Sequence, residues 1–142
     1  MTVHLIKLCV GAETLEDLAQ WQARRIKEFK KKGKKPELMH VTRQMPKRAE
    51  ELLDGGSLYW VIKGKIAVRQ RLLELREVRK NGVPHCGLVY DAKLIAVLRR
   101  SHRPFQGWRY LDPKDAPTDV RDIKAGNLPV KLKVELAELG LL

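Results

Sequence analysis

Apolar positions alternate in some stretches of the chain and recur at helical spacing in others, so the chain divides into short elements. Apolar side chains crowd residues 3–10, which predicts a first strand. From Leu15 to Phe29 they recur three or four positions apart, and Gln22 is the polar interruption of that stripe. We therefore expect a strand followed by an amphipathic helix, with Thr14 as its N-cap and Asp17 completing the cap.

The next part of the chain predicts a strand, a helix and a second strand. Residues 37–43 (ELMHVTR) have a moderate strand pattern. Residues 46–54 (PKRAEELLD) predict a second helix, with Pro46 in its first turn and Gly55-Gly56 ending it. Residues 57–64 (SLYWVIKG) form the clearest strand pattern, because aromatic and β-branched side chains cluster there.

Residues 65–80 fit two elements. As a helix, their apolar side chains would surround almost the whole circumference. As a strand, one side carries Ile66, Val68 and Leu72. Arg69 and Arg71 then face the other side, and the alternation shifts by one position at Leu73, as one inserted residue in a β-bulge would produce. We favour a long, bent strand over a helix.

Strand patterns dominate the remainder. Asn81-Gly82 predicts a turn, and two strands joined at residues 91–93 suit a hairpin. A short strand is expected within 103–111, a loop at 112–119, and a strand running into a helical turn at 128–142. Helices early and strands late predict an α+β fold, with two N-terminal helices packed on a curled, mainly antiparallel sheet or a small barrel.

The positive charge is the feature of the composition that bears on the protein's partners. Lys and Arg outnumber Asp and Glu by 29 to 17, a net charge of +12, and residues 24–48 carry eleven cations against two acids. Such a concentrated basic segment favours nucleic acid or another anionic partner, and a solvated lysine face or loop is the alternative. A length of 142 residues and a hydrophobic content of 44% are typical of a globular protein, which we expect to be a single domain over 1–142.

The cysteines and the N-terminus bear on location. Cys9 and Cys86 stand far apart in apolar runs, which favours buried thiols in a reducing compartment over a disulfide. The N-terminal stretch lacks a cationic leader, and no apolar run approaches the roughly 20 residues of a membrane helix. We therefore expect a cytoplasmic protein without membrane contact.

Side chains for metal or covalent chemistry are scattered. The histidines are His4, His40, His85 and His102. Their spacing does not suit a zinc site. Ser57 and Ser101 lack a glycine-flanked elbow, and neither a phosphate loop nor a dinucleotide-binding fingerprint is present. We expect no metal and no cofactor, and the residues indicate no reaction.

Anion binding has more support. Basic residues precede the second helix, follow the bent strand and the 93–101 strand, and alternate with aromatics at 108–110. The guanidinium fork suits phosphates, and aromatic rings beside cations suit unstacked bases, although Trp108 also fits a core. The candidate binding residues are Arg43, Lys47, Arg48, Lys63, Arg69, Arg71, Arg99, Arg100, Arg103, Trp108 and Arg109.

Several long stretches also resemble a known family. HLIKLCVGAETLEDLAQWQ, HVTRQMPKRAEELLDGGSLYWVIKG, RQRLLELREV and FQGWRYL resemble small alphaproteobacterial proteins known as a domain of unknown function. This resemblance covers nearly the whole chain and implies a bacterial cytoplasmic protein, but it brings no activity and no catalytic residues. The bent strand after SLYWVIKG, followed by a hairpin, is similar to the pseudobarrel of PUA-like domains that bind RNA and modified bases, which implies a fold alone.

These observations favour a nucleic-acid-binding protein, with RNA preferred over DNA as the partner. An enzyme acting on a phosphorylated or carboxylated small molecule, through a pocket lined by the same arginines, is the alternative. Arginines that converge in a cleft near a carboxylate or a histidine would favour the enzyme, and arginines spread along a groove would favour nucleic acid. A third reading is a basic partner for an acidic protein.

Overall fold

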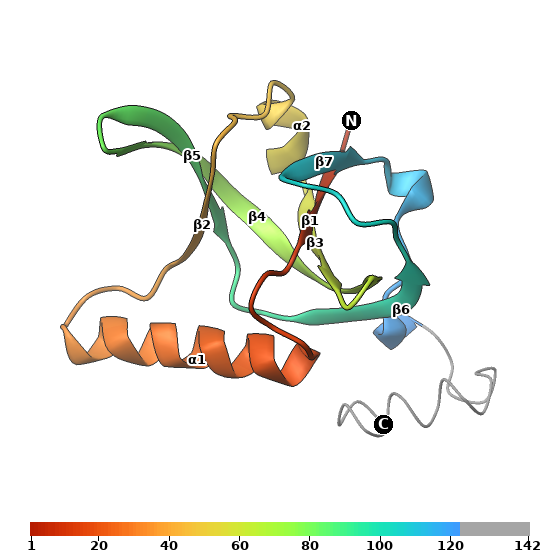
Figure 1. The fold of residues 1–142 in the computed structure, drawn as a ribbon, viewed down its shortest axis with the longest axis horizontal. Helices are drawn as coiled ribbons and strands as arrows, with labels where there is room; N and C mark the ends of the chain where they lie inside the picture. Colours follow the sequence, from red (N-terminus) through yellow and green to blue (C-terminus); the bar gives the residue numbers. More distant parts are fainter. Residues whose placement is uncertain (123–142) are drawn as a thin grey trace.

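A computed structural model describes residues 1–122, which form an α+β fold around one mixed sheet (Figure 1). The strands are β1 (His4–Leu8), β2 (Leu38–Thr42), β3 (Ser57–Ile62), β4 (Lys65–Lys80), β5 (Val83–Tyr90), β6 (Ile95–Ser101) and β7 (Trp108–Leu111). The helices are α1 (Leu15–Lys31), α2 (Ala49–Leu53) and the 3-10 turns η1 (Pro113–Asp115) and η2 (Val120–Asp122). The strand and helical turn predicted for 128–142 lie outside the described residues.

The sheet is open. Its order is β2-β5-β4-β3-β1-β7, with β6 also paired to β4, and every pairing is antiparallel except β1 with β3. The predicted α+β class is therefore confirmed, but the predicted curled sheet or PUA-like barrel is wrong. Closing a barrel requires its two edge strands to pair, and β2 and β7 lie at opposite ends of the sheet order.

Strand β4 links two parts of the sheet, because its two halves pair with different strands. It is a strand of 16 residues, as predicted, and its register with β5 shifts at Leu73, the position expected for the bulge. A second shift near Ala67, which the pattern did not indicate, puts Ile66 and Val68 into different core clusters. The first half of β4 pairs with β3 and β6, and the second half pairs with β5.

Two local predictions need correction. The expected hairpin between the strands on either side of residues 91–93 does not form, because β6 pairs with the first half of β4 instead of with β5. The second helix has only five residues and begins at Ala49, so Pro46 lies before its first turn, where it is buried. The turn at Asn81-Gly82 is confirmed, and both residues have positive φ, as a tight hairpin requires.

Helix α1 begins and packs as its sequence predicts. The Thr14 hydroxyl accepts a hydrogen bond from the Asp17 N–H at 3.0 Å. Gln22, the polar interruption in the stripe, is buried and exchanges two amide hydrogen bonds, 2.7 and 2.9 Å long, with Gln70 of β4. Gln70 Oε1 also accepts the Trp60 indole N–H at 2.9 Å, so the gap in the apolar stripe is a satisfied polar contact between helix and sheet.

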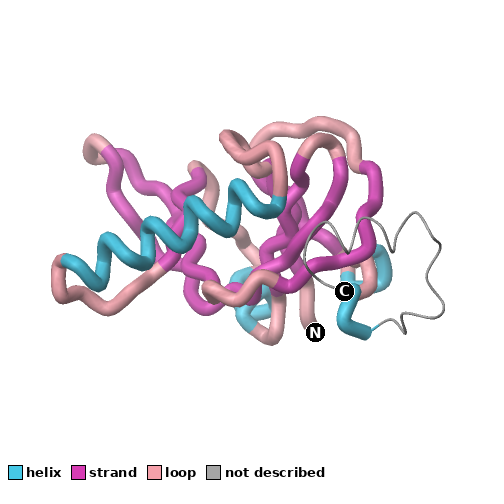
Figure 2. Tube along the Cα trace, turned by 90° about the horizontal axis from the view of Figure 1, so that it is seen from below, coloured by secondary structure: helices cyan, strands magenta, loops and turns pink. Residues whose placement is uncertain are grey.

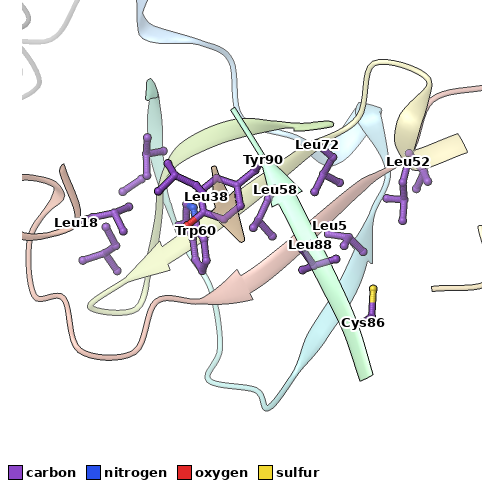
Figure 3. Close-up of a cluster of buried hydrophobic side chains, with 14 residues drawn as sticks. Leu5, Leu18, Leu38, Leu52, Leu58, Trp60, Leu72, Cys86, Leu88 and Tyr90 are labelled. Atoms are coloured by element: carbon purple, nitrogen blue, oxygen red, sulfur yellow. The ribbon is translucent and has the colours of Figure 1, made fainter. Parts of the chain in front are cut away.

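Buried side chains lie on both faces of the sheet. One cluster gathers Leu18 of α1 with Leu38, Trp60, Leu88 and Tyr90, as Figure 3 shows. α1 runs across the strands on this side (Figure 2). A smaller cluster on the other side includes side chains from β6 to the residue after η1, namely Val97, Phe105, Leu111 and Ala116. Burial on both sides explains why all six residues of β3 are buried and why its sequence reads as a continuous apolar run.

Candidate nucleic-acid interface

At the start of the second helix, where the preceding basic residues predict anion binding, Arg48 is already paired with an acid. Arg48 donates two hydrogen bonds to Glu51, at 2.6 and 2.8 Å, and its guanidinium lies 5.2 Å from the centre of the Tyr110 ring. With five residues, α2 has little helix dipole to add. Arg43 and Lys47 lie in the preceding loop, where both are exposed.

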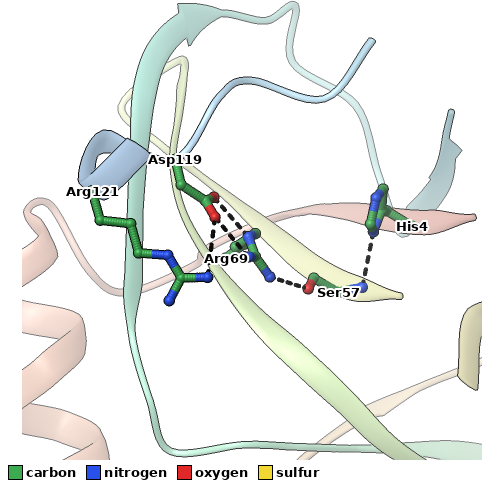
Figure 4. Close-up of polar contacts among 5 residues, drawn as sticks. All are labelled: His4, Ser57, Arg69, Asp119 and Arg121. Atoms are coloured by element: carbon green, nitrogen blue, oxygen red, sulfur yellow. Dashed lines mark hydrogen bonds and ion pairs between the residues drawn. The ribbon is translucent and has the colours of Figure 1, made fainter. Parts of the chain in front are cut away.

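Arg69 is the centre of a buried ion pair. It donates two hydrogen bonds to the Asp119 carboxylate, at 2.7 and 2.8 Å, and a third to the Ser57 hydroxyl at 2.8 Å (Figure 4). Arg121 adds a more distant contact to the same carboxylate. Hydrogen bonding from Arg69 holds the pKa of Asp119 below its usual value. This arginine therefore fastens the segment after β7 to the sheet, and we leave it out of the interface proposed below.

The remaining predicted cations on the sheet do not converge. Arg71 is exposed on β4, whereas Arg100 lies opposite Ile66 of β4 and donates a hydrogen bond to the Asp115 carbonyl. Five strand positions separate Ile66 from Arg71, which corresponds to roughly 17 Å along the strand. Arg99 and Arg103 are exposed near Arg100, and Lys63 lies 3.7 Å from Glu13 in the turn after β3.

The aromatic stretch at 108–110 takes part in packing. The Trp108 indole N–H donates to the Gln44 carbonyl at 3.1 Å, and its ring meets the Tyr110 ring edge-on with centroids 4.9 Å apart. Arg109 places its guanidinium 5.5 Å from the Phe105 ring centre. Trp108 is half-buried, so the stacking role predicted for it stays a prediction.

The cations of α1 lie away from its apolar stripe, as the sequence pattern indicates, but the candidate binding residues predicted from the sequence leave them out. Arg24, Lys27 and Lys31, which we call the α1 stripe, recur three and four positions apart and are all exposed. Cations in the last turns of a helix are favoured by its dipole, which offsets part of their mutual repulsion. Gly33, at a φ of +70°, ends the helix, and the Lys34 N–H bonds back to the Phe29 carbonyl.

A cavity of about 640 Å³ opens beside the first turns of α1. We call it the α1 pocket. It is bounded by the connection from Cys9 to Glu13, by Trp21 and Arg24 of α1, and by three side chains of the sheet. Those three are His40, Trp60 and Tyr90. Its volume lies within the range of roughly 300–1,000 Å³ typical of small-molecule sites.

The thiol, imidazole and phenol groups of the α1 pocket are uncharged near neutral pH. Burial raises the pKa of the Cys9 thiol to about 11 and that of Tyr90 to about 12. Burial, aided by the nearby Lys7 charge, lowers the pKa of His40 to about 4. Among residues 1–122, the pocket therefore presents aromatic rings, a neutral imidazole and a thiol, with Arg24 as its single arginine and Glu13 and Asp17 as its carboxylates.

Other kinds of site have less support. Among residues 1–122, no group of three or more His, Cys, Asp and Glu side chains is placed to hold a metal ion. No helix in this part of the chain is long and apolar enough to cross a membrane. Both cysteines are free thiols, with Cys86 buried, as predicted.

Comparison with known proteins gives a family. Residues 5–142 match the family model described as protein of unknown function (DUF1489). No curated protein and no solved structure matches the chain.

Proposed function

The chain belongs to the DUF1489 family of proteins of unknown function, and we propose that it binds single-stranded nucleic acid, with RNA preferred over DNA. The observation that carries this proposal is the α1 stripe, whose three exposed cations lead from the mouth of the α1 pocket into the lysine-rich segment 30–35. A row of cations at helical spacing suits the regularly spaced phosphates of a strand.

The placement of the arginines favours a nucleic acid over a small anionic substrate. A pocket for a phosphorylated or carboxylated molecule would bring several guanidinium groups together, whereas the α1 pocket contains Arg24 beside the carboxylates of Glu13 and Asp17. The exposed cations are instead spread over α1, the loop before α2 and strands β4 and β6. Arg43, Lys47, Arg71 and Arg103 stay in the proposal as outlying phosphate contacts.

An exposed aromatic beside the cations favours a single strand. Trp21 is 45% exposed and lies one turn before Arg24 on α1. Unpaired bases stack on such rings, and single-stranded segments are the usual target of sequence-tolerant RNA recognition. We place this activity in the bacterial cytoplasm, in keeping with the two free thiols.

Fluorescence anisotropy with labelled single-stranded RNA and DNA, measured over a series of salt concentrations, tests the proposal. The substitutions R24Q, K27Q and K31Q, combined in one chain, remove three exposed charges and should make the slope of log affinity against log salt shallower by about 2. The matched control R79Q/K80Q/K114Q removes three exposed charges from the β4–β5 hairpin and η1, and its slope should stay close to that of the unsubstituted protein.

Two results would count against the proposal. Absence of binding to either strand in low salt would reject nucleic-acid binding altogether. Equal loss of slope in the two triple variants would mean that net charge alone drives association and that α1 is not the interface.

A further inference from the structure

The α1 pocket has a lining suited to one class of occupant. Its sheet side carries the Trp60, Tyr90 and His40 rings, packed edge-on with centroids 5.7 and 5.9 Å apart. The Trp60 N–H is already bonded to Gln70 and this side chain is only 3% exposed, so the indole contributes a small apolar surface to the pocket and no free donor. Aromatic walls of this kind favour a flat, uncharged heterocycle.

The polar groups of Cys9 and His40 in the pocket are also neutral. An uncharged imidazole at His40 offers one donor and one acceptor nitrogen, and the Cys9 thiol is protonated near neutral pH. Neither group would attract a phosphate. The carboxylates at the mouth have other partners, since Asp17 accepts the Glu13 N–H at 3.1 Å and Glu13 lies 3.7 Å from Lys63.

The mouth of the pocket joins the α1 stripe. Arg24 belongs to both, and Trp21 stands beside it at the rim with almost half of its surface exposed. Trp21 lines the cavity and keeps 45% of its surface exposed, so a ligand can reach its ring from the rim. A phosphate on Arg24 would therefore hold the attached nucleotide directly over the opening.

We propose that the α1 pocket receives one extruded nucleobase of the bound single strand, stacked on Trp21, while Arg24 holds the adjacent phosphate. This inference rests on the proposed function and adds to it the group that is recognised. The volume of about 640 Å³ is ample for a base with its sugar. The α1 stripe supplies affinity that depends on salt, and the pocket supplies contacts that do not.

Two variants test the pocket without changing charge. W21A removes the stacking ring and should weaken binding of single-stranded RNA about 10-fold, with the salt slope unchanged, whereas W21F should keep most of the affinity. A12W places a ring inside the cavity that Ala12 lines and should produce a similar loss. Circular dichroism of each variant verifies that the protein remains folded.

Photocrosslinking identifies the occupant directly. A single strand carrying iodouracil, irradiated in complex with the full chain, should give adducts on Trp21, His40 or Tyr90 when the peptides are mapped by mass spectrometry. The A12W variant should lose these adducts. In K27Q/K31Q, which keeps Arg24, adducts should persist at protein concentrations that restore binding.

The results separate the two proposals. If the protein binds strands in a salt-dependent way but crosslinks only outside the pocket, and W21A and A12W bind as the unsubstituted protein does, the proposed function stands and the base pocket is wrong. If anisotropy detects no binding in low salt, the proposed function fails and the pocket inference fails with it.

Discussion

Removing the Asp119 carboxylate should destabilise the fold by about 3–5 kcal/mol. The Asp119 and Arg69 side chains are only 9% and 18% exposed, and two hydrogen bonds of 2.7 and 2.8 Å join them. In Asp119→Ala the guanidinium keeps its bond to Ser57 but loses two hydrogen bonds to a carboxylate that is only 9% exposed. The loss should therefore exceed the value of an exposed ion pair several-fold.

The chain supplies a matched control for this experiment. Arg76 donates two hydrogen bonds to Glu37, at 2.8 and 2.9 Å, in the same paired geometry. These side chains are 38% and 36% exposed, and Arg76 also keeps a contact to Glu74. Because water can replace the lost carboxylate, Glu37→Ala should lower the free energy of unfolding by about 1 kcal/mol or less. The two ion pairs therefore differ chiefly in how deeply their side chains are buried.

Urea unfolding followed by circular dichroism at neutral pH measures both variants. The double variant Arg69→Met with Asp119→Ala should recover part of the stability lost in Asp119→Ala, since no charge is then left buried. The pKa of Asp119 in the folded protein lies below its usual value of 3.8. On acidification, the Asp119 carboxylate is therefore protonated in the unfolded chain at a higher pH than in the folded protein. The stability that the pair contributes is then present above about pH 4 and is lost as the pH falls through the lowered pKa. Equal losses in Asp119→Ala and Glu37→Ala would refute the argument from burial.

Two further predictions concern the backbone and a buried histidine. A Cβ on Gly56 would meet the backbone carbonyl oxygens of Leu52 and Val3, so Gly56→Ala should lower the free energy of unfolding by about 2–3 kcal/mol in urea titrations, and an unchanged midpoint would contradict this. The pKa of His40 is lowered to about 4, so the unfolded state binds more protons between pH 6.5 and 4. Between pH 7 and pH 5, the free energy of unfolding should therefore fall by about 2 kcal/mol more in the unsubstituted protein than in His40→Gln. Parallel plots of unfolding free energy against pH for the two proteins would disprove this prediction.

Much of the fold could be predicted from short-range pattern. The cap at Thr14, the turn at Asn81-Gly82 and the bulge at Leu73 each follow from residues within a few positions of one another. The missed features involve distant segments. β6 pairs with residues 65–69 of β4, before the bulge, whereas β5 pairs with β4 from Leu72 onward. Local alternation does not indicate which strand will pair with each half of β4.

The candidate interface, like the fold, could be predicted from the sequence only in part. The basic segment 24–48 and the helical spacing of Arg24, Lys27 and Lys31 are evident from the sequence, but the position of that row beside a pocket required the helix to be placed against the sheet. Trp21 could have been singled out because it lies off the apolar stripe that begins at Leu15. The pocket itself had no sequence pattern, since Cys9, His40 and Tyr90 come from three strands and connections far apart in the chain.

The sequence by itself determined the elements and the concentration of positive charge, because periodicity, capping and composition act over a few residues. Only the tertiary structure decided which cations remain on the surface. Arg69 and Arg71 look equivalent in the strand pattern, yet Arg69 is enclosed by an aspartate 50 residues later while Arg71 stays exposed. A buried charge needs a partner, and packing of distant segments decides whether one is there.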